Sequence, residues 1–118
     1  MYVKRVPPFV KDANNLRAVA PNLIFVGVEW CRFCKEAKPI LEEVARVLGT
    51  SVPVYYVDAD VNKHLAKSLG VKSYPTIFYA SNDGLFQFEG TRSVNNIVGF
   101  VCEHSSGSAS HRFCTASK

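Results

Sequence analysis

The sequence predicts one α/β domain in which a mixed central β-sheet is flanked by helices on both faces. Two observations carry this prediction: apolar, strand-like runs alternate with helical patterns, and a turn cluster at 81–84 separates two further strand-like runs. Strands joined by helices run parallel with the helices against the sheet, whereas a hairpin adds antiparallel strands. With 118 residues, 47% of them hydrophobic, the chain has enough apolar material for one core.

The predicted elements follow one another in the order β-α-β-α-β-α-β-β-α. Residues 23–28 form a near-continuous apolar run, typical of a strand that is buried on both faces. Apolar residues then recur at spacings of three and four up to Leu48, which predicts a helix that stops at Gly49. The other predicted elements are a weak strand at 3–6, a helix at 11–19, a strand at 52–57, a short helix at 65–69, a hairpin of strands at 76–80 and 85–88, and a helix at 94–101 that Ser93 caps.

Composition sets the domain organisation and excludes several classes of protein. We expect residues 1–104 to form the domain and 105–118 to form a Ser/Gly-rich C-terminal tail. The net charge is +4, but the cations are scattered, so we expect a solvated basic surface and no nucleic-acid groove. No run reaches the ~18–20 apolar residues of a membrane span. Residues 1–10 lack the apolar region of a signal peptide, so we expect a cytoplasmic protein, and nothing demands more than a monomer.

The chemistry is concentrated in the segment Trp30-Cys31-Arg32-Phe33-Cys34-Lys35. A cysteine at the start of a helix points its sulfur at unpaired N–H groups and at the positive end of the helix dipole, which favours the thiolate. Arg32 and Lys35 add positive charge. We therefore expect Cys31 to attack a disulfide of a substrate protein and Cys34, one turn further on, to resolve the mixed disulfide by closing an internal bridge.

Zinc sites use the same cysteine spacing and are the structural alternative. Zinc requires further ligands, and the candidates lie in or after the last helix, where they would bind among themselves more easily than with Cys31. These candidates are Cys102, His104, His111 and Cys114. We therefore expect no metal at the cysteine pair, and no bound cofactor, because the chain lacks a Gly-rich phosphate loop.

A second feature is Pro75, which stands at the start of a predicted strand, where it has no N–H to donate to the sheet. The shared pattern comprises Trp30-Cys31-x-x-Cys34-Lys35, Pro39, Tyr74-Pro75-Thr76, Gly84 and Gly90. Through this pattern the sequence resembles the thioredoxin family over roughly residues 3–103. The resemblance implies a thioredoxin-like fold, a cis Pro75 that faces Cys31, and a substrate segment paired with the backbone of Tyr74. The residues we expect to contact substrate are Trp30, Arg32, Phe33, Tyr74 and Pro75.

The sequence departs from this family at two places. Arg32-Phe33 replaces the Gly-Pro usual between the cysteines of thioredoxins and the Gly-His of disulfide isomerases, which favours a more oxidising pair. Phe25 and Tyr56 stand where thioredoxins carry a buried acid and its lysine partner. Glu29 is close in sequence, but we expect it at the surface and assign it no role.

We expect a protein-disulfide reductase that acts on protein disulfide substrates and is recycled by a thioredoxin-reductase-type electron donor. One alternative is a protein disulfide isomerase or oxidase, which Arg32-Phe33 favours. Another is a redox-inert binding module, which the retention of both cysteines disfavours.

The tail and the aromatic residues carry further expectations. We expect Cys102 and Cys114 to be free thiols, with a Cys102–Cys114 disulfide as the first alternative, a metal site as the second, and a Cys114 that reaches Cys31 as the third. We expect seven aromatic residues in the core: Phe9, Phe25, Phe78, Tyr79, Phe86, Phe88 and Phe100.

Overall fold

The computed structural model describes residues 2–105 and 113–114. The order of elements is the predicted one, and the predicted helix that stops at Gly49 begins directly after Cys31. The elements are β1 (Lys4–Arg5), α1 (Ala13–Ala18), β2 (Asn22–Gly27), α2 (Arg32–Leu48), β3 (Val54–Asp58), α3 (Lys63–Ser68), β4 (Thr76–Ser81), β5 (Gly84–Gln87) and α4 (Val94–His104).

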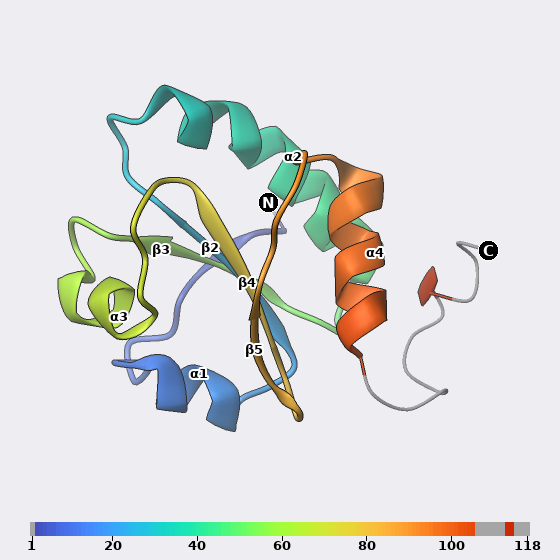
Figure 1. The fold of residues 1–118 in the computed structure, drawn as a ribbon, viewed down its shortest axis with the longest axis horizontal. Helices are drawn as coiled ribbons and strands as arrows, with labels where there is room; N and C mark the ends of the chain where they lie inside the picture. The colour runs from blue at the N-terminus through green and yellow to red at the C-terminus, as the bar shows by residue number, and fades with distance from the viewer. Residues whose placement is uncertain (1, 106–112, 115–118) are drawn as a thin grey trace.

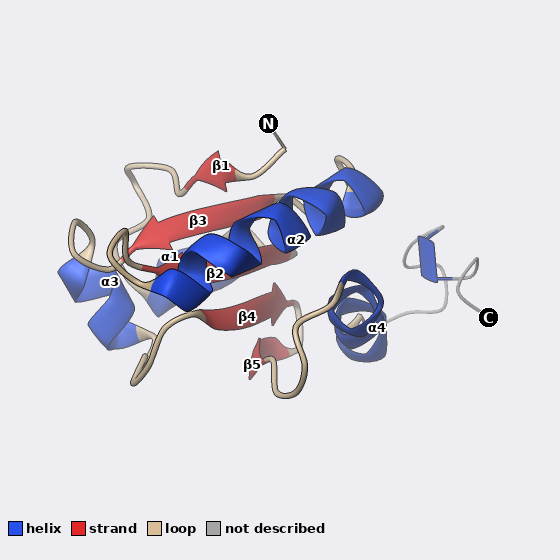
Figure 2. Ribbon diagram, turned by 90° about the horizontal axis from the view of Figure 1, so that it is seen from above, coloured by secondary structure: helices blue, strands red, loops and turns tan. Residues whose placement is uncertain are grey.

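The five strands form one mixed sheet in the order β1-β3-β2-β4-β5. β1, β3 and β2 are parallel, whereas β4 is antiparallel to β2 and pairs with β5 as the predicted hairpin. Helices α2 and α4 cover one face of this sheet, and α1 and α3 cover the other (Figures 1 and 2). The predicted three-layer α/β architecture is therefore confirmed.

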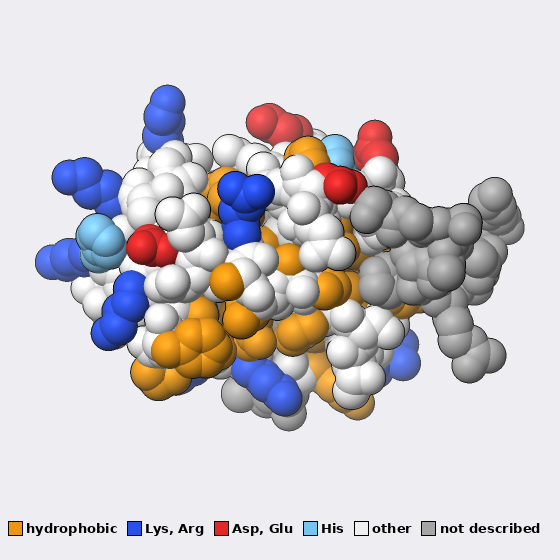
Figure 3. Space-filling view, turned by 90° about the horizontal axis from the view of Figure 1, so that it is seen from below, with side chains coloured by type: hydrophobic (Ala, Val, Ile, Leu, Met, Phe, Trp, Pro, Cys, Tyr) orange, Lys and Arg blue, Asp and Glu red, His pale blue; other side chains and the backbone are white. Residues whose placement is uncertain are grey.

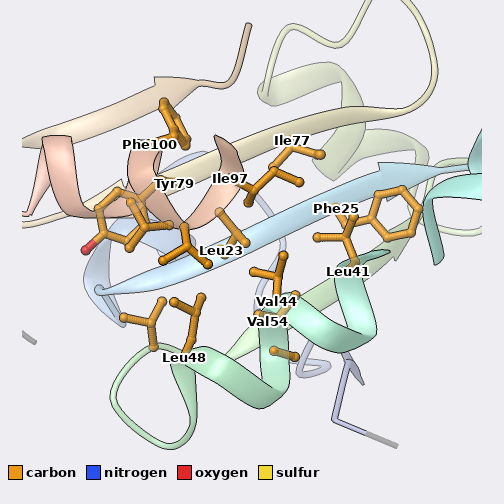
Figure 4. Close-up of a cluster of buried hydrophobic side chains, with 14 of the residues drawn as sticks. Leu23, Phe25, Leu41, Val44, Leu48, Val54, Ile77, Tyr79, Ile97 and Phe100 are labelled. Atoms are coloured by element: carbon orange, nitrogen blue, oxygen red, sulfur yellow. The ribbon is translucent and has the colours of Figure 1, made fainter. Parts of the chain in front are cut away.

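The central strand β2 separates two apolar clusters, and all six of its residues are buried. On the side of α2 and α4, Leu23 and Phe25 of β2 pack against Leu41 and Ile97 (Figure 4). Ile24 and Val26 point to the opposite side, where they pack in a second cluster that holds residues of α1 and α3. Burial of one such side chain contributes about 1.5–3 kcal/mol, so the two clusters fix β2 and the ends of the elements around it.

The prediction of core aromatic residues is correct for six of the seven and wrong for Phe9. Phe25, Phe78, Tyr79 and Phe100 are buried, and Phe86 and Phe88 are half-buried at the margin of the same core. Phe9 is 61% exposed, whereas its neighbour Val10 is only 4% exposed. Two prolines precede Phe9 in this loop, and the turn there directs Val10 rather than Phe9 into the core.

The expectation of free thiols at the C-terminal end is wrong, and the first alternative is correct. Cys102 and Cys114 form a disulfide, with their Cα atoms 5.5 Å apart. Phe113 packs against the larger core cluster and so brings Cys114 back to the last turn of α4. Cys114 is therefore not available as a competitor for Cys31. His111 lies outside the described residues, as does most of the predicted tail at 105–118.

The surface agrees with the scattered charge of the sequence. On the face shown in Figure 3, Lys and Arg side chains stand apart from one another among uncharged and acidic ones, and hydrophobic side chains gather between them. Within residues 2–105 and 113–114, no helix is both long enough and apolar enough to cross a membrane.

Candidate active site

The site lies at the N-terminus of α2, where the chain leaves the buried strand β2. Cys31 is the N-cap residue of this helix, with extended backbone angles, and its side chain makes no capping hydrogen bond. The first N–H groups of α2 therefore have no side-chain acceptor from the N-cap, and the helix dipole places partial positive charge there. This arrangement stabilises a negative charge on the Cys31 sulfur.

The two cysteines differ sharply in exposure and in acidity. Cys31 is half-exposed, whereas Cys34 is completely buried. The pKa of Cys31 is lowered chiefly by a hydrogen bond from the Cys34 thiol, which outweighs the opposing effect of burial. The backbone N–H groups of Cys34 and Phe33 and the charge of Arg92 lower it further by smaller amounts. Burial raises the pKa of Cys34 to about 11, and its hydrogen bond to Cys31 adds to the shift. Cys31 is thus the cysteine that loses its proton first, next to a Cys34 that stays a thiol at neutral pH.

The loop before β4 closes the other side of the site. The Tyr74–Pro75 peptide bond is cis, as the resemblance implied. The Cys31 sulfur lies 3.8 Å from the carbonyl oxygen of Tyr74, at the distance of a weak thiol hydrogen bond. The hydroxyl of Thr76 donates to the carbonyl of Ser73 at 2.6 Å and fixes the turn around Pro75. The structure also contains a cis Ala20–Pro21 bond, which our sequence analysis did not identify.

Exposed aromatic rings stand next to the two cysteines. Trp30 is 69% exposed and Phe33 is 58% exposed. The indole N–H of Trp30 donates to Asp60 at 2.9 Å, and its ring meets Tyr74 edge-on at a centroid distance of 6.2 Å. Phe33 lines a shallow pocket of about 300 Å³ between α2 and the loop before α4. Large apolar groups left in water beside a reactive sulfur are typical of a surface that binds other molecules.

The comparison with known protein families agrees with this geometry. The profile of the family described as "Thioredoxin" matches residues 9–103 of the chain. The chain belongs to the thioredoxin family.

Individual relatives fall into two groups. The chain is 31% identical to protein disulfide-isomerase 2-3 of Arabidopsis thaliana, in an alignment that covers the whole chain and 28% of that protein. It is 33% identical to a thioredoxin of Rhodospirillum rubrum over 64% of this chain and 72% of that one. The first thioredoxin domain of mouse protein disulfide-isomerase A4 superposes with a TM-score of 0.71 at 26% identity, covering 90% of this chain and 76% of that one. The chain spans only about a quarter of the length of the disulfide isomerases that it matches.

The chain is therefore a thioredoxin-family domain that carries a pair of free cysteines at the start of α2. Within residues 2–105 and 113–114, no group of three or more His, Cys, Asp or Glu side chains could hold a metal ion.

The positive charge that acts on both sulfurs comes from Arg92, a residue outside the cysteine motif. Arg32 was expected to stabilise the Cys31 thiolate, but its side chain is 86% exposed and pairs with Glu36 at 3.1 Å. Arg92, in the loop between β5 and α4, lowers the pKa of both cysteines. The sequence feature that could have indicated Arg92 is its position directly after Gly90-Thr91, in the loop between the last strand and the last helix.

Where thioredoxins carry a buried acid, this domain has an aromatic pair. Phe25 is 1% exposed, and its ring lies 5.3 Å from that of Tyr56 on the neighbouring strand. The Tyr56 hydroxyl donates to a carboxylate oxygen of Glu29 at 3.2 Å. Glu29 lies at the surface, as expected, and forms an ion pair with Lys38 at 3.5 Å.

Proposed function

We propose that this thioredoxin domain catalyses dithiol–disulfide exchange on protein substrates, with Cys31 as the nucleophile and Cys34 as the resolving thiol. The observation that carries the proposal is the contrast between the two sulfurs. One is half-exposed at a helix N-terminus with a lowered pKa, and the other is completely buried with a raised pKa. Only the exposed sulfur is both accessible and easier to ionise than an ordinary thiol, and the thiolate is the form that attacks disulfides.

The exchange proceeds in two displacements. The Cys31 thiolate attacks one sulfur of the substrate disulfide, the substrate bond breaks, and the other substrate sulfur leaves as a thiolate. Cys34 then loses its proton and attacks Cys31, so that the mixed disulfide breaks and the substrate leaves with both sulfurs reduced. The domain ends with a Cys31–Cys34 disulfide, and the reverse sequence oxidises a substrate dithiol.

We propose that an extended segment of the substrate pairs with the backbone of Tyr74 beside Cys31. The support is the 3.8 Å separation between the Cys31 sulfur and the Tyr74 carbonyl, together with the exposed rings of Trp30 and Phe33 on either side of Cys31 in the sequence. Backbone pairing gives affinity without demanding a particular side chain, so the proposed substrates are proteins with an accessible, extended disulfide segment.

For the net direction, we propose an isomerase or oxidase rather than the reductase favoured by sequence alone. A stabilised Cys31 thiolate stabilises the reduced form, which makes the pair a better oxidant. The Cys102–Cys114 disulfide also favours an oxidising compartment over the cytoplasm, because structural disulfides are rare where thiols are kept reduced. The reductase remains the competing proposal, and it requires a thioredoxin-reductase-type electron donor.

The equilibrium potential of the Cys31–Cys34 pair tests the direction. It is measured against a glutathione buffer with Cys102 and Cys114 changed to serine, and the same protein with Cys34→Ser serves as the control that shows no two-electron transition. A potential near −180 mV, about that of a disulfide isomerase, supports the isomerase. A potential near −270 mV, about that of thioredoxin, supports the reductase. If the pair forms no internal disulfide, the exchange function itself is wrong.

A further inference from the structure

The resolving step poses a problem that the two cysteines do not solve by themselves. Cys34 is completely buried, and it must lose a proton before it can attack Cys31. In the resting state its hydrogen bond goes to Cys31, but in the mixed disulfide Cys31 has lost its negative charge and is a poor acceptor. The buried polar residues that the structure describes are Asn22, Thr76 and Ser81, none of which is an acid. The proton therefore has to reach an acceptor outside the core.

The space around the Cys34 sulfur leads to the ring of Tyr56. The sulfur packs over Gly27, so closely that a Cβ at this position would lie 2.9 Å from it. The same Cβ would lie 3.5 Å from the edge of the Tyr56 ring. The thiol of Cys34 and the ring of Tyr56 thus share the space that the missing side chain of Gly27 leaves open. Tyr56 lies on β3, in register with Phe25, and extends from this space towards the surface.

The outer end of Tyr56 meets an exposed carboxylate. Its hydroxyl lies 3.2 Å from Glu29, whose side chain is 64% exposed. Lys38 lies 3.5 Å from the same carboxylate and 5.3 Å above the centre of the Tyr56 ring. These contacts hold Glu29 over the hydroxyl and leave it open to water. The pKa of Tyr56 is raised, chiefly by burial and also by Glu29, so the hydroxyl stays neutral and can pass a proton without holding a charge.

We infer that Tyr56 and Glu29 form the route by which Cys34 loses its proton when it resolves the mixed disulfide. The inference rests on the proposed exchange function and adds the proton transfer that this function needs. The proton passes from the Cys34 sulfur to the Glu29 carboxylate by way of the Tyr56 hydroxyl, directly or through one water. The electron pair left on Cys34 forms the bond to Cys31, the bond between Cys31 and the substrate breaks, and the substrate sulfur leaves as a thiolate. Glu29 then releases its proton to the solvent.

The chromogenic disulfide dithiobis(nitrobenzoate) separates the two steps in a stopped-flow experiment. Attack by Cys31 releases a first equivalent of the coloured thiolate, and attack by Cys34 on the resulting mixed disulfide releases a second. Tyr56→Phe removes the hydroxyl but keeps the ring, and Glu29→Gln removes the carboxylate charge at an exposed position. Glu43→Gln is the matched control. Glu43 is also a partly exposed carboxylate in an ion pair, but its partner is Arg46 of α2.

We expect Tyr56→Phe and Glu29→Gln each to slow the second release about tenfold at pH 7, a modest loss for general base catalysis. The first release is unchanged in both variants, the double variant is no slower than either single one, and Glu43→Gln changes neither step. In the two variants the second rate also rises more steeply with pH than in the parent protein, because only hydroxide and water remain as acceptors. The charged and titratable groups that face Cys34 and Tyr56 from the packed elements are Cys31, Arg92, Glu29, Lys38 and Asp58.

The sign of the Glu29 effect distinguishes this route from simple electrostatics. If Glu29 acted only through its negative charge, its removal would make the Cys34 thiolate easier to form and would speed the second release. A second release that is faster or unchanged in Glu29→Gln, or unchanged in Tyr56→Phe, overturns the inference. Failure of the exchange function looks different, because the parent protein would then release no second equivalent at all.

Discussion

The sulfur of Cys31 and the carbonyl oxygen of Tyr74 lie 3.8 Å apart, although 43 positions separate the two residues in the chain. Cys31 is placed there by the start of α2 and Tyr74 by the loop that leads through Pro75 into β4. The antiparallel strands β2 and β4 are buried along their whole length, so both residues follow or precede the most deeply buried part of the sheet. The nucleophile and the backbone group proposed to receive the substrate are therefore positioned by the same two strands.

The Tyr74 side chain tests the proposed substrate surface. Tyr74→Ala keeps the carbonyl but removes the ring that meets Trp30 edge-on. We expect KM for a disulfide-containing peptide to rise about two- to tenfold, the range of one aromatic contact, with kcat nearly unchanged. Steady-state kinetics measure both values. Tyr2→Ala is the control, since Tyr2 is an exposed tyrosine outside the site, and a fall in kcat without a change in KM argues against a binding role for Tyr74.

Arg92 is predicted to make a small contribution to the acidity of the two cysteines. Cys31 has a lowered pKa, so its reaction with iodoacetamide rises with pH and levels off below the ordinary thiol value of about 8.5. Cys34, with a pKa of about 11, stays unreactive over the same range. Arg92→Gln removes a charge that lowers the pKa of both cysteines, so we expect the pH midpoint of the Cys31 reaction to move to higher pH. Arg32→Gln removes a cation that is paired with Glu36, so we expect it to leave the pH dependence of the Cys31 reaction unchanged. A larger shift in Arg32→Gln than in Arg92→Gln would show the assignment to be wrong.

Gly27 is predicted to be required for packing around Cys34. A Cβ at Gly27 would lie 2.9 Å from the Cys34 sulfur and 3.3 Å from its Cβ, so Gly27→Ala forces the start of α2 away from the sheet. We expect a loss of about 1–3 kcal/mol in the free energy of unfolding. Gly99→Ala in α4 is the control: nothing lies within 4 Å of its added Cβ, and we expect a gain of about 0.5–1 kcal/mol from helix propensity. Urea denaturation gives both values, and equal effects of the two substitutions would contradict the packing argument.

The Cys102–Cys114 disulfide is predicted to stabilise the fold without affecting the chemistry. It closes a sequence separation of 12 residues, which corresponds to about 2–3 kcal/mol in the free energy of unfolding. The end of α4 that carries Cys102 and the start of α2 lie at opposite ends of the molecule (Figures 1 and 2). We therefore expect the double Cys102→Ser, Cys114→Ser variant to unfold at a lower urea concentration than the parent protein. We expect the rate of Cys31 alkylation to be the same in both proteins. A large change in that rate would show that the two sulfur pairs communicate.

The fold was predictable because its strongest signals are local. The apolar run of β2, the spacing of Leu41, Val44 and Leu48, and the turn before β5 each reflect a single element and its buried face. For most strands, the predicted first and last residues differ from the observed ones by one or two positions. Phe9 was mistaken for a core residue because hydrophobicity alone does not show which of two adjacent apolar residues a turn directs inward.

The site was predictable only where its residues are close in sequence. The cysteine pair and its position at a helix start follow from a short motif. The cis peptide bond between Tyr74 and Pro75 followed from the family resemblance. The influence of Arg92, the contact between Tyr56 and Glu29, and the Cys102–Cys114 disulfide depend on how distant segments meet. Arg32 shows the opposite case, because its nearest partner was Glu36, one helical turn along, rather than the sulfur beside it.

The central claim, that Cys31 attacks and Cys34 resolves, is tested most directly by trapping the mixed disulfide. Each cysteine is changed to serine in turn, the protein is mixed with a peptide that carries one disulfide, and the covalent adduct is measured by mass spectrometry. We predict that Cys34→Ser accumulates an adduct through Cys31, because no second thiol is present to release the peptide, whereas Cys31→Ser forms almost none, because Cys34 is buried and protonated. An adduct that forms equally fast in both variants would contradict the assignment.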